Sequence, residues 1–138
     1  LGGKSELVID GTSLGRPVSD MLWDQNIPHS AITMTGGQEW RESGRYVNAS
    51  KTLMIENLAV MFASGDLKFS HDLLLRKEIE EDLASFTTQT TAAGNQIITQ
   101  PRNASGHGDL GIGLICAAFA SQYLVPQTIT VEQLEGWY

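Results

Sequence analysis

Two aspartates stand where carboxylates could bind a divalent metal ion. Asp10 ends the short apolar run Glu6-Leu7-Val8-Ile9, and Asp109 opens the almost wholly apolar segment from Leu110 to Ala120. Carboxylate oxygens suit Mg²⁺ or Mn²⁺, which proteins hold with a few acidic side chains together with water and substrate phosphate. Each aspartate also has a structural alternative. Asp10 could bond the amides of the turn that follows it, and Asp109 could cap a helix whose dipole favours a carboxylate at its start.

Several other chemistries find no support in the sequence. It contains neither a Gly-x-Ser-x-Gly elbow nor a Walker-type phosphate loop. The histidines His29, His71 and His107 lack the spacing of zinc ligands. The single cysteine, Cys116, lies within the apolar segment, where it reads as a small core residue with no disulfide partner. Metal-assisted chemistry at the two aspartates is the possibility that remains.

The composition predicts one globular domain over residues 1–138. Hydrophobic residues make up 41% of the chain and charged residues 18%, which is typical of a folded protein. The formal net charge of −7 has the wrong sign for binding nucleic acid through bulk electrostatics, so any such contact must be local or bridged by metal. No apolar run reaches the roughly 18 residues of a membrane span, and Leu1 to Ser5 do not form a signal peptide. We therefore expect a cytoplasmic protein that contacts no membrane.

The elements around Asp10 predict a parallel pair of strands. The run Glu6 to Ile9 reads as a strand, Pro17 opens a helix that ends by about Asn26, and Ala31 to Thr35 reads as a second strand. A strand, a helix and a strand in this order form a parallel pair with a crossover. Ligands gather at the carboxyl ends of such strands, and Asp10 lies at one of these ends.

The most basic local stretch runs from Gln38 to Val47, and we predict that it is a loop. It places Trp40 and Tyr46 next to Arg41 and Arg45. Aromatic side chains between arginines can stack on bases or grip phosphates, but they can equally hold a loop against the fold.

The remaining elements are predicted from periodicity and from capping residues. Asn48 or Ser50 caps a helix that closes at Ser64-Gly65, and the glycines near Asp109 indicate close approach of another group. The other expected segments are a short strand at Leu67 to Phe69, a helix from Leu73 to Phe86 whose charge run is solvated, a turn from Thr87 to Gly94, a strand at Gln96 to Thr99, a helix after Gly108 that is buried on every face, and a short helix around residues 131–134.

At these residues the chain resembles the large terminase subunits of tailed bacteriophages. The stretch Leu7-Val8-Ile9-Asp10-Gly11-Thr12-Ser13-Leu14-Gly15-Arg16-Pro17-Val18-Ser19-Asp20-Met21-Leu22 is similar to the family pattern V-D-x-T-G-x-G-R-P-V-x-D-L-L. The order that follows is also similar, with Thr33 to Gly37, Lys51 to Met54, Gly65 to Phe69, Glu78 to Phe86 and finally Gly106-His107-Gly108-Asp109. The resemblance covers about residues 7–123, and its specificity lies in the order and spacing of motifs that are individually weak.

The resemblance implies a ribonuclease-H-like α/β fold, in which helices flank a mixed sheet, and a nuclease that cuts concatemeric viral DNA during genome packaging. In that family three acidic residues hold divalent metal. Asp10 would be the second and Asp109 the third, with His107 beside them and Mg²⁺ or Mn²⁺ as the cofactor. Arg41, Arg45 and Lys51 are candidate contacts to double-stranded DNA. A complete terminase would also bind a small subunit and a portal in the cytoplasm of a bacterial host.

The sequence departs from the family at its start. The family's first acidic residue lies on a strand that precedes the Asp10 strand, and only Leu1 to Glu6 precede it here. Glu6 lies about 13 Å from Asp10 along one strand, too far to share an ion with it. We therefore expect a nuclease-domain fragment without its ATPase domain, its first strands or its first carboxylate. The exposed strand edge would favour a homodimer. The alternatives are another ribonuclease-H-like nuclease, or a non-catalytic prophage remnant that serves as an interaction module.

Overall fold

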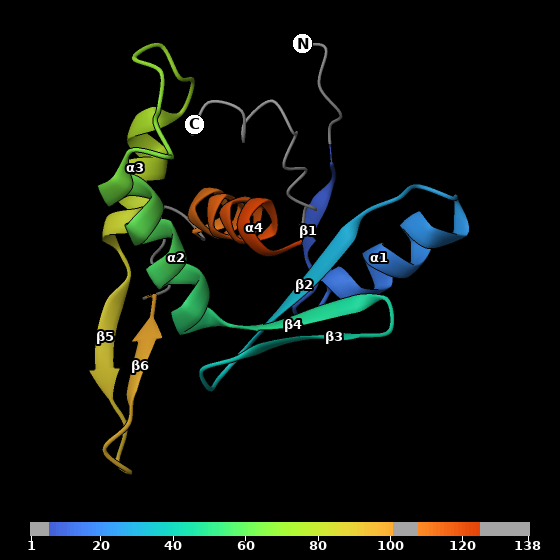
Figure 1. Ribbon diagram of the computed structural model, residues 1–138, viewed down its shortest axis with the longest axis horizontal. Coiled ribbons are helices and arrows are strands. Elements are labelled where there is room, and N and C mark those ends of the chain that lie inside the picture. The colour runs from blue at the N-terminus through green and yellow to red at the C-terminus, as the bar shows by residue number, and fades with distance from the viewer. Residues whose placement is uncertain (1–5, 101–107, 125–138) are drawn as a thin grey trace, which may run out of the picture.

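The computed structural model describes residues 6–100 and 108–124, which form a mixed α/β fold (Figure 1). In chain order the elements are β1 (Val8–Asp10), α1 (Gly15–Asp24), β2 (Ser30–Thr35), β3 (Trp40–Ser43), β4 (Tyr46–Ser50), α2 (Lys51–Ser64), α3 (Arg76–Ala84), β5 (Thr87–Thr90), β6 (Gln96–Thr99) and α4 (Asp109–Tyr123). No helix among these residues is long and apolar enough to cross a membrane.

The main sheet has the strand order β1-β2-β4-β3, in which β1, β2 and β4 are parallel and β3 is antiparallel to β4. The parallel pairing of β1 with β2 across α1 confirms the arrangement expected from the sequence. Asp10 pairs with Ile32, so β2 continues three residues beyond the end of β1. The carboxyl ends of the three parallel strands thus lie at the same end of the sheet, and β4 adds a third strand to the pair that the sequence predicted.

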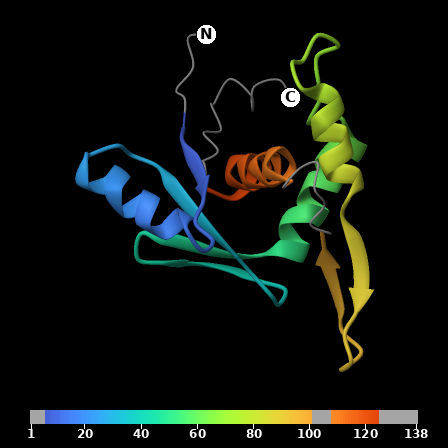
Figure 2. The same cartoon turned by 180° about the vertical axis from the view of Figure 1, so that it is seen from behind.

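Helices flank this sheet on both faces (Figures 1 and 2). Helix α1 contacts β1 and β2, whereas α4 contacts β1 and α2, and α2 continues directly from β4. Helix α3 packs against α4, and β5 and β6 form a separate two-stranded hairpin. The result is a mixed sheet between layers of helices, which is the architecture predicted at the level of fold class.

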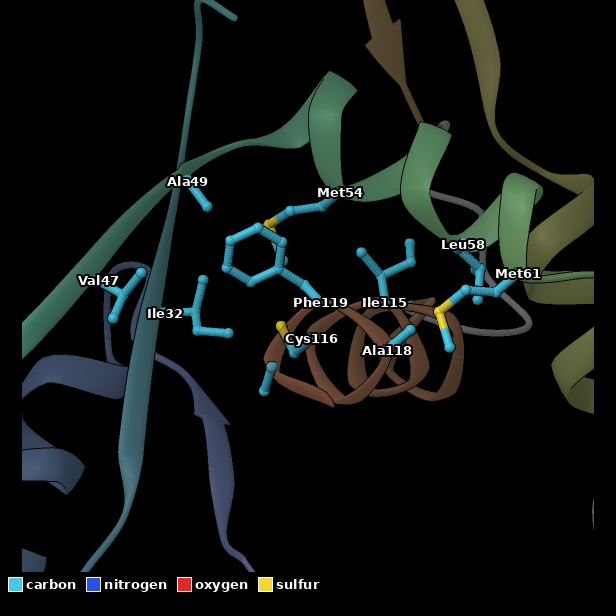
Figure 3. Packing of buried hydrophobic residues seen from close by; sticks show 11 residues of the cluster. Ile32, Val47, Ala49, Met54, Leu58, Met61, Ile115, Cys116, Ala118 and Phe119 are labelled. Carbon is cyan, nitrogen blue, oxygen red and sulfur yellow. The ribbon is translucent and has the colours of Figure 1, made fainter. Parts of the chain in front are cut away.

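The core lies between the sheet and α2 and α4. Phe119 of α4 is fully buried and reaches between Ile32 of β2 and Met54 of α2 (Figure 3). Its ring stacks on Tyr123 at 4.7 Å between centroids and meets the edge of Trp40 at 5.8 Å. Burying a side chain of this size stabilises the fold by about 1.5–3 kcal/mol, so Phe119 helps to fix α4 to the sheet.

The prediction of a loop from Gln38 to Val47 was wrong, because β3 and the start of β4 occupy this stretch. Gly44, with φ of +63°, opens a two-residue turn between the paired residues Ser43 and Tyr46. A glycine at this point matches the twist of the flanking strands. Val47 and the other buried residues of β4 then join the core.

Three further segments differ from the sequence prediction. The expected strand at Leu67 to Phe69 has no regular structure. The helix expected from Leu73 begins only at Arg76, because Leu75 takes a left-handed conformation with φ of +62°. The turn expected from Thr87 to Gly94 contains the strand β5, whose exposed threonines favour an extended backbone. The helix around residues 131–134 lies outside the described residues.

The structure confirms helix α2 and its cap, since Ser50 Oγ accepts a hydrogen bond from Leu53 N at 3.3 Å. It also confirms β6 and α4. The burial of α4 on every face was wrong, because Leu110 and Gly113 lie on an exposed side. An added Cβ at Gly113 would meet nothing within 4 Å, so this glycine accommodates no close neighbour.

Candidate functional site

Asp10 is the last residue of β1, and its side chain lies exposed at the carboxyl edge of the sheet. Its Oδ1 accepts a hydrogen bond from the backbone N–H of Thr12 at 2.9 Å. The backbone N–H of Gly11 continues the pairing with β2 by donating to the carbonyl oxygen of Ile32 at 2.7 Å. The carboxylate is therefore held in a local turn, as the structural alternative predicted, and it still presents an exposed oxygen ligand at the strand end.

Gly15, at the start of α1, approaches the backbone of Asp10 closely. A Cβ at this glycine would overlap the carbonyl oxygen of Asp10 and lie 2.8 Å from its carbonyl carbon. The absence of a side chain at this position thus sets how closely α1 can approach the end of β1. This contact fixes the backbone that carries the Asp10 carboxylate.

Asp109 is the first residue of α4 and is exposed. Gly108 precedes it with φ of +71°, and the side chain of Gln100 occupies the place where a Cβ of this glycine would lie. The close approach predicted for Gly108 is therefore present. His107 lies outside the described residues.

The carboxylate that bonds the first turn of α4 is Asp82 of α3 rather than Asp109. Its Oδ2 accepts a hydrogen bond from the backbone N–H of Gly111 at 3.1 Å, and a Cβ at Gly111 would lie 3.2 Å from the Cβ of Asp82. The close approach expected at Gly111 is thus confirmed, but Asp82 does not belong to a wholly solvated face. The sequence carried no signal for this role because Asp82 stands in a run of charged residues on an amphipathic helix.

Asp109 begins α4, and Asp10 ends the strand β1 that packs against this helix. Burial and, to a smaller extent, the charge of Asp10 raise the pKa of the Cys116 thiol to about 12. Asp109 precedes Cys116 by seven residues, a rise of about 10 Å along the helix axis. Among residues 6–100 and 108–124, no group of three or more His, Cys, Asp or Glu side chains could hold a metal ion. The sharing of ions by the two carboxylates stays a prediction.

The basic residues predicted to contact DNA lie in different places. Arg45 is in the turn of the β3–β4 hairpin, at the end of β4 opposite to Lys51, which begins α2. Its guanidinium lies 5.6 Å from the centroid of the Trp23 ring. Arg41, on β3, lines a groove of about 620 Å³ together with Trp40 and the loop after β2. Arg41 and Lys51 thus flank the carboxyl edge, whereas Arg45 does not.

The aromatic side chains of the β3–β4 hairpin pack within the fold. Trp40 contacts Phe119, and Tyr46 donates its hydroxyl hydrogen bond to Oδ1 of Asp20 at 2.6 Å. This hydrogen bond, together with the charge of Asp20, raises the pKa of Tyr46. The guanidinium of Arg16 lies over the Tyr46 ring at 4.8 Å from its centroid. Asp20 therefore contacts its own domain, in line with the structural role that its place on the helix suggests.

Comparisons with protein-family models, curated proteins and solved structures gave no match to this chain.

Proposed function

We propose that this chain is the ribonuclease-H-like nuclease domain of a phage large terminase, which hydrolyses phosphodiester bonds of viral DNA with Mg²⁺ or Mn²⁺. The observation that carries the proposal is the place of Asp10, exposed at the carboxyl end of a parallel strand against which α4, the helix that begins with Asp109, packs. Further support comes from the resemblance of the sequence around these residues to the terminase motifs.

Asp10 and Asp109 offer exposed carboxylate oxygens, which are the kind of ligand that a hard divalent cation prefers. Asp10 and Asp109 would hold the metal, with His107 beside them. The bound ion would supply charge neutralisation at the phosphate and lower the pKa of an attacking water. Within the chain, the N–H of Thr12 orients the Asp10 carboxylate, and Asp82 fixes the start of α4 and thereby the backbone of Asp109. In a complete terminase the partners would be double-stranded DNA, a small subunit and a portal, in the cytoplasm of a bacterial host.

The test is nicking of supercoiled plasmid DNA by the purified chain in Mn²⁺. We expect slow nicking that is abolished by EDTA and by either Asp10→Asn or Asp109→Asn. Asp24→Asn is the matched control, because it removes the same charge from an exposed site at the end of α1. Nicking that persists in both Asp10→Asn and Asp109→Asn would refute the assignment.

A second candidate is a non-catalytic interaction module that retains the fold. It is favoured by the lack of a three-residue metal-binding group among the described residues. Calorimetry distinguishes the two candidates. A chain that neither nicks DNA nor binds Mn²⁺ is the non-catalytic module, whereas Mn²⁺ binding that is lost in Asp10→Asn supports the nuclease site.

A further inference from the structure

A groove of about 740 Å³ opens at the carboxyl ends of β2 and β4. The loop that follows β2, the first turns of α2 and the β5–β6 hairpin form its walls, and these elements can be followed in Figure 1. The residues that matter for its chemistry are Gly36, Gln38, Lys51, Thr52, Asn95 and Gln96. Its volume falls within the range of about 300–1,000 Å³ that is typical of ligand sites.

Two hydrogen bonds in series link this groove to Asp10. Met34, which lines the groove, donates its backbone N–H to Oγ1 of Thr12 at 3.2 Å. Thr12 in turn donates its own backbone N–H to the Asp10 carboxylate. A polymeric ligand in the groove would therefore lie next to β2, the strand that pairs with β1 and its carboxylate Asp10.

Among residues 6–100 and 108–124, Lys51 is the only basic residue that lines the groove, and Glu56 is the only acidic one. The ammonium group of Lys51 lies over the Phe86 ring, 5.4 Å from its centroid, which holds the side chain in place. Lys51 is also the first residue of α2, where the positive end of the helix dipole disfavours a cation. The helix dipole therefore gives no reason for a lysine here. The contact with the Phe86 ring keeps the ammonium group at the groove, where it can attract an anionic ligand.

The rest of the groove suits a chain that carries both phosphates and hydrogen-bonding groups. Gly36 borders it, and a Cβ added at this glycine would meet nothing within 4 Å, so the fold itself does not require glycine there. The bare backbone leaves room for a ligand to approach closely. The amides of Gln38, Asn95 and Gln96 can donate to and accept from bases and sugars.

We propose that this groove binds the backbone of a DNA strand beside the cleavage site, with Lys51 contacting a phosphate and the amide side chains contacting the adjoining nucleotides. The inference rests on the proposed nuclease function for the identity of the ligand. It goes beyond that function by assigning the path of the substrate, and it can be tested without cleavage.

The experiment measures binding of a fluorescein-labelled 20-base-pair duplex to the whole chain by anisotropy, in EDTA and at low salt. We expect Lys51→Ala to weaken binding about tenfold, the effect of losing one hydrogen bond to a charged group. The slope of log K against log salt should fall by about 0.9, as for one lost phosphate contact. Lys77→Ala is the matched control, because this exposed lysine of α3 lies outside the groove. The same affinity and slope in Lys51→Ala and Lys77→Ala would overturn the inference.

Two further variants separate the groove from a general effect of charge. Gly36→Val adds no charge and should weaken binding while leaving the melting temperature unchanged, because its side chain enters open space beside the groove. Glu56→Gln should strengthen binding by removing the acidic group. If Gly36→Val folds normally and binds as well as the wild type, the strand does not lie in this groove.

Asp10→Asn distinguishes this inference from the proposed function. Because the assay contains EDTA, the metal does not contribute to binding, and adding Lys51→Ala to this variant should still weaken binding about tenfold. Nicking by the wild type together with unchanged binding by the groove variants would refute the groove and leave the nuclease standing. Binding that depends on Lys51 in a chain that does not nick DNA would refute the nuclease and leave the groove as a DNA-binding site.

Discussion

Exchanging glycine for alanine at two helical positions should change the free energy of unfolding in opposite directions. Gly113 lies inside α4, is exposed, and has open space where a Cβ would be. Alanine there should stabilise the chain by about 0.8–1 kcal/mol, the difference in helix propensity between the two residues. Gly15 lies at the first position of α1, where the higher helix propensity of alanine adds little stability. A Cβ added there would overlap the carbonyl group of Asp10.

The second substitution forces backbone against backbone, which a change of rotamer cannot relieve. Overpacking of this kind typically costs about 1–3 kcal/mol, so Gly15→Ala and Gly113→Ala should differ by about 2–4 kcal/mol in total. Urea unfolding followed by circular dichroism measures both values, with equal m-values expected for the two variants. In thermal unfolding the two midpoints should differ by roughly 5–15 °C for a chain of this size.

This reasoning makes the contact between α1 and the end of β1 responsible for the effect. If Gly15→Ala proves as stable as the wild type, the close approach of Gly15 to Asp10 is not a constraint on the fold. A loss of stability in Gly113→Ala would show that the exposed side of α4 is in contact with another group.

Three other perturbations test the core, the cap and the sheet edge. Burial raises the pKa of the Cys116 thiol to about 12, above its value in the unfolded chain. The thiol's contribution to stability should therefore be lost as the pH rises from about 9 to 12. Cys116→Ala should lack this part of the decline in the urea midpoint. Ser50→Ala should cost about 1–2 kcal/mol in urea unfolding, because it removes the cap of α2 and the hydrogen bond to the carbonyl oxygen of Gly37 at 2.7 Å. Light scattering at micromolar concentration should give the mass of a dimer paired along β1, the edge strand of the main sheet. Leu7→Lys puts a charge beside this strand and should give a monomer. A monomeric wild type would refute this pairing.

The sequence predicted the elements whose signals are local. Pro17 near the start of α1, Ser50 as the cap of α2, the apolar stripe of α2 and the apolar run of α4 each act within a few residues, and the structure contains all these helices. The parallel order of β1 and β2 also followed from the sequence, because a helix between two strands permits few other arrangements.

The β3–β4 hairpin was missed because its signal is distributed across the fold. Gly44 followed by Arg45 is a possible two-residue turn, but the flanking residues do not alternate clearly between apolar and polar. Ala49 and Ser50 are small, and their burial results from packing between β2, β3 and the helices. Tertiary contact rather than local preference makes this stretch a strand.

The difference between local signals and tertiary contacts also explains which parts of the candidate site the sequence could predict. Asp10 was found because it directly follows a strand, and Asp109 because it opens a helix. Lys51 was named as a candidate DNA contact, but its contact with Phe86 and the bond from Gly111 to Asp82 join residues that are distant in the chain. Such pairings leave no local pattern.

The carboxyl edge of the sheet is therefore a product of topology. Three parallel strands end there, and each delivers a different element, namely the Asp10 turn from β1, the Gly36-Gly37 loop from β2 and the start of α2 from β4. Thr12 ties the first of these to β2 through its bond from Met34, and Ser50 ties the third to the second through its bond to Gly37. Because these bonds join all three loops, a change at one of them should move the other two. An anionic chain bound along these strand ends would thus meet the Asp10 turn and Lys51 on one hydrogen-bonded surface.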